Sequence, residues 1–163
     1  MQNLHFSQLI FAQAKKYGDK VAMSYRENAT EQWSDLTWTK FADQVLAVAK
    51  ALVELGVVEQ HRIAQFSQNK TENLIVDFAA FATRATVVPM YATSTAPQVE
   101  YIVNDAQIEI IMVGNQQQYN IALEVLQNSQ FLKKIIVFDK EVVFKEAAHT
   151  MYYHDMVLLG EKS

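Results

Sequence analysis

Cysteine is absent from the 163-residue sequence, and glycine and proline are scarce, with four and two residues respectively. Without cysteine the chain can hold no disulfide, no thiolate metal site and no cysteine nucleophile. The four glycines, Gly18, Gly56, Gly114 and Gly160, are widely spaced, and the closest two are 38 positions apart. The sequence therefore has no glycine-rich loop of the kind that cradles phosphate, and any nucleotide chemistry would need residues from elsewhere.

The chain also lacks a basic stripe and a long apolar run. Its 14 Lys and Arg residues and 18 Asp and Glu residues give a net charge of −4 without long blocks of either sign, which argues against nucleic-acid binding. No apolar stretch reaches the roughly 20 residues of a membrane-spanning helix, and no signal peptide is visible. We therefore expect one domain, residues 1–163, without a transmembrane segment and in the cytoplasm. Peripheral membrane association is left open for a full-length form.

Hydrophobic periodicity predicts a helix over residues 4–16 and an antiparallel hairpin over residues 20–38. A second helical stripe runs from Thr39 to Leu55, with Thr39 as its expected N-cap and Gly56 at its end.

N-terminal signals in the sequence predict two later helices. Asn69 can form a capping box with Glu72, so a helix is expected to begin there. Its predicted buried face consists of Leu74, Ile75, Phe78, Phe81 and Ala82. Another helix is expected near Thr95, because Pro97 then falls in the first turn, where a missing N–H costs nothing.

Four short, almost continuous apolar runs are typical of strands buried on both faces; they cover residues 62–67, 86–91, 108–113 and 134–138. The segments between them contain 18, 16 and 20 residues, enough for helical crossovers, which predicts parallel pairing. The predicted fold class is α/β: a three-layer sandwich with a mostly parallel sheet, helices on both faces and an N-terminal β-hairpin. The tail adds an expected strand at 142–144 and a helix at 154–159.

Two turns at the carboxyl ends of predicted strands are candidate binding elements, because open α/β sheets bind ligands there. The first is the turn at 66–69, which a simple helix cap also explains. The second follows the strand at 86–91, where Met90, Tyr91 and Thr93 are candidates for the wall of a substrate pocket; a chain reversal at a sheet edge is the alternative.

The remaining polar residues predict no catalytic, cofactor-binding or metal site. The histidines lack metal-ligand spacing; they are His5, His61, His149 and His154. Glu141 and Glu146 lie in a charged tail, and no Gly-x-Ser-x-Gly turn is present for a serine nucleophile.

An ordered series of segments resembles the N-terminal region of AMP-forming acyl-CoA synthetases, over most of residues 8–139. The series comprises Leu36-Thr37-Trp38, the stripe from Phe41 to Gly56-Val57, Arg62-Ile63-Ala64 closing on Asn69, Val88-Pro89-Met90-Tyr91 and Tyr101-Ile102-Val103-Asn104-Asp105. The segments 89–94 and 98–102 look most like the long-chain fatty-acid ligases of bacteria. Gln60-His61 and Arg84 depart from the family, which usually has Gly-Asp and a glycine at these places.

The resemblance implies a ligase that converts ATP, a fatty acid and coenzyme A to acyl-CoA, AMP and pyrophosphate, with Mg²⁺ neutralising phosphate charge. The phosphate loop, the ATP-binding motifs and the lysine-bearing lid of the family would lie beyond Ser163, so no catalytic residue is carried over. We expect this chain to be a scaffold half of an adenylation subdomain, without a cofactor of its own and inactive alone. Its expected partners are the remainder of its own polypeptide and, in the complete enzyme, a fatty acid; an exposed sheet edge would also permit a homodimer.

Two alternatives remain open. The chain could be a free-standing α/β domain that binds a small ligand or another protein, or a fragment of an enzyme that adenylates an amino or aryl acid. The first is distinguished by whether the gene continues past Ser163 into a glycine-rich loop, and the second by which acid supports pyrophosphate exchange.

Overall fold

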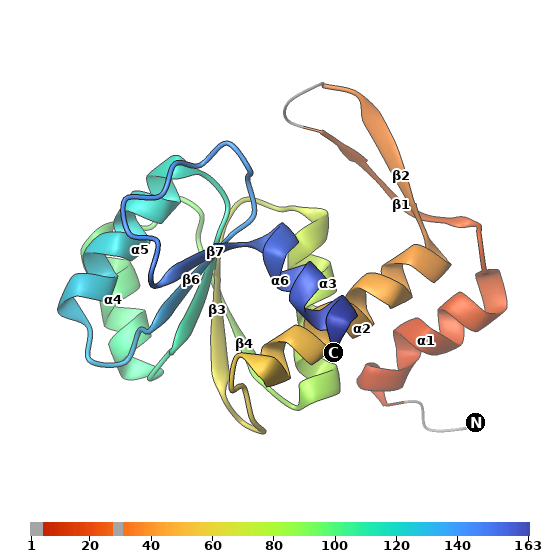
Figure 1. Cartoon of the computed structure of the whole chain (residues 1–163), viewed down its shortest axis with the longest axis horizontal. Coiled ribbons are helices and arrows are strands. Elements are labelled where there is room, and N and C mark those ends of the chain that lie inside the picture. Colours follow the sequence, from red (N-terminus) through yellow and green to blue (C-terminus); the bar gives the residue numbers. More distant parts are fainter. Residues whose placement is uncertain (1–4, 28–30) are drawn as a thin grey trace.

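The computed structural model describes residues 5–27 and 31–163, which form a mixture of helices and strands (Figure 1). The elements are α1 (Phe6–Tyr17), β1 (Val21–Arg26), β2 (Trp33–Thr37), α2 (Trp38–Glu54), β3 (Arg62–Phe66), α3 (Thr71–Thr83), β4 (Thr86–Met90), α4 (Ala96–Asp105), β5 (Ile110–Val113), α5 (Gln116–Asn128), β6 (Lys134–Val137), β7 (Thr150–Tyr152) and α6 (Tyr153–Lys162).

The main sheet has five parallel strands in the order β4-β3-β5-β6-β7. All four predicted strands and their parallel pairing are confirmed. Because β4 lies on one side of β3 and β5 on the other, the chain reverses its direction of travel across the sheet at β3. This reversal creates a crevice between the carboxyl ends of β3 and β5, the place where open α/β sheets bind ligands.

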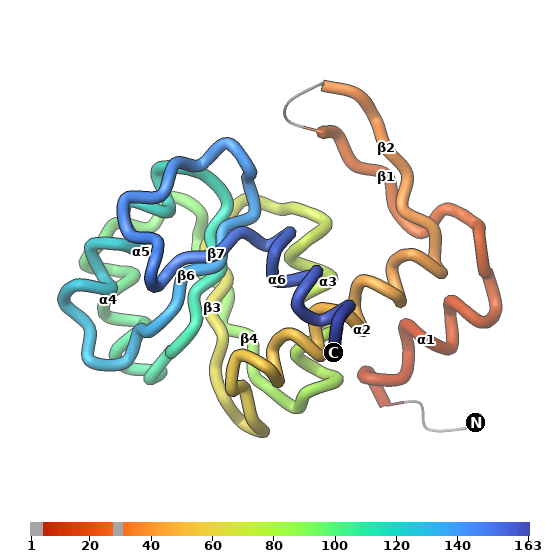
Figure 2. Tube along the Cα trace, in the orientation of Figure 1, coloured from red at the N-terminus to blue at the C-terminus, as the bar shows by residue number. Residues whose placement is uncertain are grey.

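Helices cover both faces of the sheet, as predicted (Figure 2). Alternate strand residues face opposite sides: Ile63 and Ile110 pack with α2, α3 and α6, whereas Ala64 and Ile111 pack with α4 and α5. Each face has its own apolar core, and α1 packs on the outside of α2 and α3. The fold class is therefore the predicted three-layer α/β sandwich.

The predicted hairpin is also confirmed, with β1 and β2 paired antiparallel and projecting from the body of the molecule (Figure 1). Its end differs from the expectation, since Trp38 is the first residue of α2 rather than the last of a strand. Thr37, not Thr39, caps this helix, because Thr37 has an extended backbone and its hydroxyl accepts a hydrogen bond from the Lys40 N–H at 3.3 Å.

The start and the buried face of α3 differ from the prediction. Lys70, not Asn69, is the N-cap, and no capping box forms because the loop turns one residue later. The buried residues are Ile75, Val76, Ala79 and Ala80. Of the predicted face only Ile75 is buried and Phe78 is half-buried, whereas Leu74, Phe81 and Ala82 are exposed. The small alanines let α3 pack closely between α2 and the sheet.

Two strand predictions were wrong in detail. The segment at 142–144 forms no strand; Val142 is instead buried beside the sheet, where its carbonyl accepts a 2.6 Å hydrogen bond from the Tyr152 hydroxyl. The tail strand is β7, at Thr150–Tyr152. Strand β4 is not buried on both faces, because it is an edge strand, with Thr86 and Pro89 exposed.

Gly160 is required where α6 crosses α2. A Cβ at this position would collide with the carbonyl oxygen of Ala47 and lie 2.6 Å from its carbonyl carbon, so two helix backbones would have to separate. We expect Gly160→Ala to lower the free energy of unfolding by about 1–3 kcal/mol, measured by urea denaturation. Ala47→Gly should not rescue the variant, because the obstacle is backbone. A loss no larger than that of Leu158→Ala, a change at a partly exposed position of the same helix, would contradict this account.

Candidate functional site

The candidate site is a cleft of about 980 Å³ between the hairpin and the carboxyl edge of the sheet. Tyr25 and Trp33 line it from the hairpin, and Asn69, Lys70, Asn115 and Asp139 from the loops that follow β3, β5 and β6. It includes the crevice at which the chain reverses direction, so the topology and the cavity indicate the same place.

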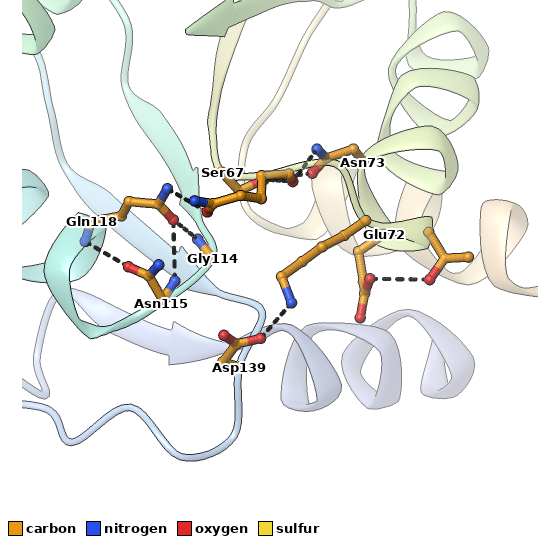
Figure 3. Close-up of polar contacts among 10 residues, drawn as sticks. Ser67, Glu72, Asn73, Gly114, Asn115, Gln118 and Asp139 are labelled. Atoms are coloured by element: carbon orange, nitrogen blue, oxygen red, sulfur yellow. Dashed lines mark hydrogen bonds and ion pairs between the residues drawn. The ribbon is translucent and has the colours of Figure 1, made fainter. Parts of the chain in front are cut away.

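Gln118 holds the carboxyl edge together. Its side chain is 2% exposed, and its Oε1 accepts hydrogen bonds from the N–H groups of Gly114 (3.0 Å) and Asn115 (3.2 Å) (Figure 3). Its Nε2 donates to Gln68 Oε1 at 3.0 Å and to the Ala92 carbonyl at 3.1 Å. All four hydrogen-bonding positions of the amide are thus used, and the loops after β3, β4 and β5 are joined through one side chain.

Gly114 is a glycine because the edge is packed tightly around it. A Cβ there would lie 2.7 Å from Gln118 Oε1 and 3.0 Å from the Ser67 Cβ. Any larger residue would push Gln118 out of its position or separate the ends of β3 and β5. Gly114 and Gly160 therefore both stand where an added Cβ would meet a buried amide or a backbone carbonyl.

A second network fixes the loop after β3. The Ser67 hydroxyl contacts Asn73 Oδ1 at 2.9 Å, and Asn73 Nδ2 donates to the Gln68 carbonyl at 3.0 Å. On β3 itself, the buried Gln65 side chain donates to Asp77 Oδ1 at 3.2 Å. Burial raises the pKa of the Asp77 carboxyl, and the hydrogen bond from Gln65 offsets part of this rise.

Two of the residues that line the cleft, Lys70 and Asp139, form an ion pair. Lys70 Nζ lies 2.7 Å from Asp139 Oδ1, and both side chains are only 18% exposed (Figure 3). Because each charge is largely removed from water, loss of either partner would leave the other poorly solvated. The pair connects the loops after β3 and β6 across the end of β5. It lies at the same edge of the sheet where Gln118 joins the loops after β3, β4 and β5.

The described residues offer no ready cradle for a triphosphate at this edge. Gln118 already occupies the N–H groups of Gly114 and Asn115, and Lys70 is held by Asp139. No group of three or more His, Asp or Glu side chains able to hold a metal ion occurs in the part of the chain that the structure describes. Within residues 5–27 and 31–163, no helix is long and apolar enough to span a membrane.

The residues predicted for a pocket wall lie at the end of β4, outside the described cleft. Met90 is buried against the core under α4, whereas Tyr91 is 87% exposed and Thr93 is also exposed. The carbonyl of the intervening Ala92 accepts from Gln118, so this loop is tied to the same carboxyl edge. Their role as a pocket wall stays a prediction.

Sequence reasoning missed Gln118, Lys70 and Asp139. A signal for Gln118 was present, because Asn115 and Gln118 have the spacing of a capping box. Both hydrogen bonds of this capping box form at the start of α5. The pairing of Lys70 with Asp139 joins residues 69 positions apart, and no local pattern indicates it.

Comparison with known proteins gives a family match: the model of the AMP-binding enzyme family matches residues 10–155. Among curated proteins, the long-chain-fatty-acid–CoA ligase ACSBG2 of Xenopus laevis is 28% identical over 155 residues, which are 94% of this chain and 20% of that protein. The long-chain-fatty-acid–CoA ligase FadD15 of Mycobacterium tuberculosis is 31% identical over 104 residues, 64% of this chain and 17% of that protein. The chain thus spans about a fifth of the length of these relatives.

Two solved structures share the fold at low sequence identity. The A-PCP didomain of the carboxylic acid reductase from Segniliparus rugosus, in complex with AMP, superposes with a TM-score of 0.84 at 17% identity, covering 98% of this chain and 27% of that one. The anthranilate CoA ligase AuaEII superposes with a TM-score of 0.81 at 16% identity, covering 95% of this chain and 28% of that one.

Replacement of Gln118 tests whether this amide holds the edge. Gln118→Ala leaves the buried Gly114 N–H and the Ala92 carbonyl without their partner, so we expect the free energy of unfolding to fall by about 2–4 kcal/mol in urea denaturation. Gln117→Ala, at an exposed neighbouring position of α5, is the matched control and should change stability by less than about 0.5 kcal/mol. Equal effects of the two substitutions would contradict the role given to Gln118.

The raised pKa of Asp77 predicts a pH dependence of stability. The folded state holds the Asp77 proton more tightly than the unfolded state, so the free energy of unfolding decreases as pH rises from the ordinary value of 3.8 through the higher folded pKa. Asp77→Asn removes this dependence and keeps an oxygen that can accept from Gln65. We expect the stability of the variant relative to the wild type to increase as pH rises from about 3.8 through the raised folded pKa, measured by urea denaturation over a pH series.

Asp43→Asn removes an exposed carboxylate from α2 and controls for the change in net charge. A stability difference between Asp77→Asn and wild type that is the same at every pH would show that burial of the Asp77 carboxylate carries no penalty.

Proposed function

Because the chain belongs to the AMP-binding enzyme family, we propose that it forms the N-terminal part of a long-chain fatty acid–CoA ligase. The observation that carries the proposal is the combination of a family match over residues 10–155 with relatives that are long-chain-fatty-acid–CoA ligases in both a vertebrate and a bacterium. The ordered segments of the sequence support the same assignment.

The proposed reaction has two steps. An oxygen of the fatty-acid carboxylate attacks the α-phosphorus of ATP and pyrophosphate leaves, giving an acyl-adenylate. The thiolate of coenzyme A then attacks the acyl carbon and AMP leaves, giving the thioester. Mg²⁺ would neutralise charge on the phosphates during the first step.

In this reaction the present chain serves as a platform. It contributes a rigid sheet whose carboxyl edge is preformed by Gln118 and by the pair of Lys70 and Asp139. Since its described residues hold no phosphate cradle, we assign the binding of ATP, Mg²⁺ and coenzyme A to the remainder of the polypeptide. We expect the chain alone to be inactive and the complete enzyme to act in the cytoplasm.

The loop after β4 is the part of this chain that we assign to the acyl pocket. Tyr91 and Thr93 are exposed and stand at the carboxyl edge, so their side chains are available to a pocket completed by other segments. Met90 fills the base of this loop and can adapt to a flexible chain. Each buried methylene contributes about 0.8 kcal/mol, so such a wall would favour long acids over short ones.

Thioester formation by the complete polypeptide, with acids from acetate to palmitate, tests the proposal. We expect AMP and pyrophosphate to be released only with a fatty acid and coenzyme A present, and kcat/KM to rise steeply with chain length. Tyr91→Ala should lower kcat/KM for palmitate about tenfold, equivalent to contact with two methylenes, and change octanoate less. Tyr101→Ala, at a tyrosine on α4 that is 70% exposed, is the control and should leave both unchanged.

Equal activity on acetate and palmitate would remove the long-chain assignment. Activity confined to amino or aryl acids would replace it with the corresponding adenylating enzyme, and a reading frame without a glycine-rich loop would favour a free-standing binding domain. Turnover by the 163-residue chain alone would contradict its role as a platform.

A further inference from the structure

The turn after β4 carries the two exposed residues that we assign to the acyl pocket, Tyr91 and Thr93. Its internal hydrogen bonds are local. The Ser94 N–H donates to the Tyr91 carbonyl at 2.9 Å, and the Thr95 N–H donates to Gln98 Oε1 at 2.9 Å in the first turn of α4. These bonds shape the turn but do not attach it to the sheet. Strand β4 supports it from one side only, because β4 is an edge strand.

One side chain attaches this turn to the body of the domain. Gln118 Nε2 donates to the carbonyl of Ala92 at 3.1 Å, and Ala92 lies between the two pocket residues. In the part of the chain that the structure describes, no other side-chain hydrogen bond joins residues 91–93 to a different element. Tyr91 is 87% exposed, so packing does little to hold its ring. The position of the ring therefore depends on the backbone that Gln118 holds.

The two ends of the Gln118 amide have different tasks (Figure 3). Oε1 accepts from the N–H groups of Gly114 and Asn115 and so holds the loop after β5. Nε2 donates to the Ala92 carbonyl and to Gln68 Oε1. A carboxylate in place of the amide would keep the two bonds on the acceptor side and lose both donors. The attachment of the turn can thus be removed while the loop after β5 stays held.

We propose that Gln118 is a positioning residue that sets the preference for long acyl chains, by holding the Ala92 carbonyl and with it the Tyr91 ring. Gln118 is buried and has no free hydrogen-bonding position, so it acts through the turn and does not contact the substrate. A pocket wall that moves loses part of its contact with a long chain, whereas a short chain makes less of that contact. The inference rests on the proposed function, because it takes Tyr91 to line the acyl pocket of a fatty-acid ligase.

Gln118→Glu in the complete polypeptide tests this role, with thioester formation from palmitate and from octanoate as the measurement. We expect the ratio of kcat/KM for palmitate to that for octanoate to fall about fourfold at about pH 8, the equivalent of one buried methylene. Gln117→Glu makes the same change of charge at an exposed neighbouring position of α5 and should keep the ratio. Gln68→Ala removes the other acceptor of Nε2 and should keep it too. A wild-type ratio in Gln118→Glu, or an equal fall in Gln68→Ala, would overturn the proposal.

The pH profile of Gln118→Glu separates the lost donor from general damage to the fold. Burial raises the pKa of a carboxyl, and the protonated form regains an O–H that can donate to Ala92. The preference for palmitate should therefore recover as the pH falls from about 8 to about 6. A preference that is lost and does not return in acid would assign the defect to the fold and overturn the role.

A double-mutant cycle shows whether Gln118 acts through Tyr91. In the double variant Tyr91→Ala/Gln118→Glu the ratio should equal that of Tyr91→Ala alone, because the ring that Gln118 positions is already absent. Independent effects, in which the two losses multiply, would overturn the proposal.

Gln118→Met keeps the test available if the buried carboxylate prevents folding, since methionine fills a similar volume without a donor or a charge. Its ratio should also fall, and a wild-type ratio in this variant would overturn the proposal. A wild-type polypeptide that forms no fatty-acyl thioester, or that shows no preference for palmitate, overturns the proposed function and this role together. A wild-type preference that survives the loss of the Gln118 donor overturns only the role of Gln118.

Discussion

A side-chain amide that is removed from water must find protein partners for all of its hydrogen-bonding positions, and Gln118 meets this requirement at the carboxyl edge of the sheet. Its partners lie in the loops after three different strands. Those loops therefore hold one arrangement before any ligand arrives. Gly114 is part of the same constraint, because only a residue without a side chain allows the amide to approach.

This constraint is consistent with the platform role that we propose for a chain with so little glycine. The edge is built from buried amides and an ion pair, which give rigidity, and not from open N–H groups, which would bind phosphate. In the proposed function this rigidity would help to position reacting groups held by other segments, since such groups must be held within a fraction of an ångström.

The parallel strands were predictable because each is a short apolar run bounded by a connection long enough for a helix. The start of α4 was equally clear, since Thr95 and Pro97 both act within one turn of chain. Predictions failed where the decision was not local: β7 exists because β6 offers it an edge, and the exposed face of α3 depends on how closely its alanines approach their neighbours. The site was missed for the same reason, because Gln118 matters through contacts made after folding.

The account depends most on the claim that Gln118 holds the carboxyl edge as a permanent part of the native structure. Native-state hydrogen exchange of the Gly114 amide measures this directly, since that N–H is bonded to the Gln118 side chain. The account predicts that it exchanges only through global unfolding, with the same free energy as the β5 amide of Met112 at the centre of the sheet. Exchange of Gly114 through a local opening, at a much lower free energy than Met112, would contradict the account.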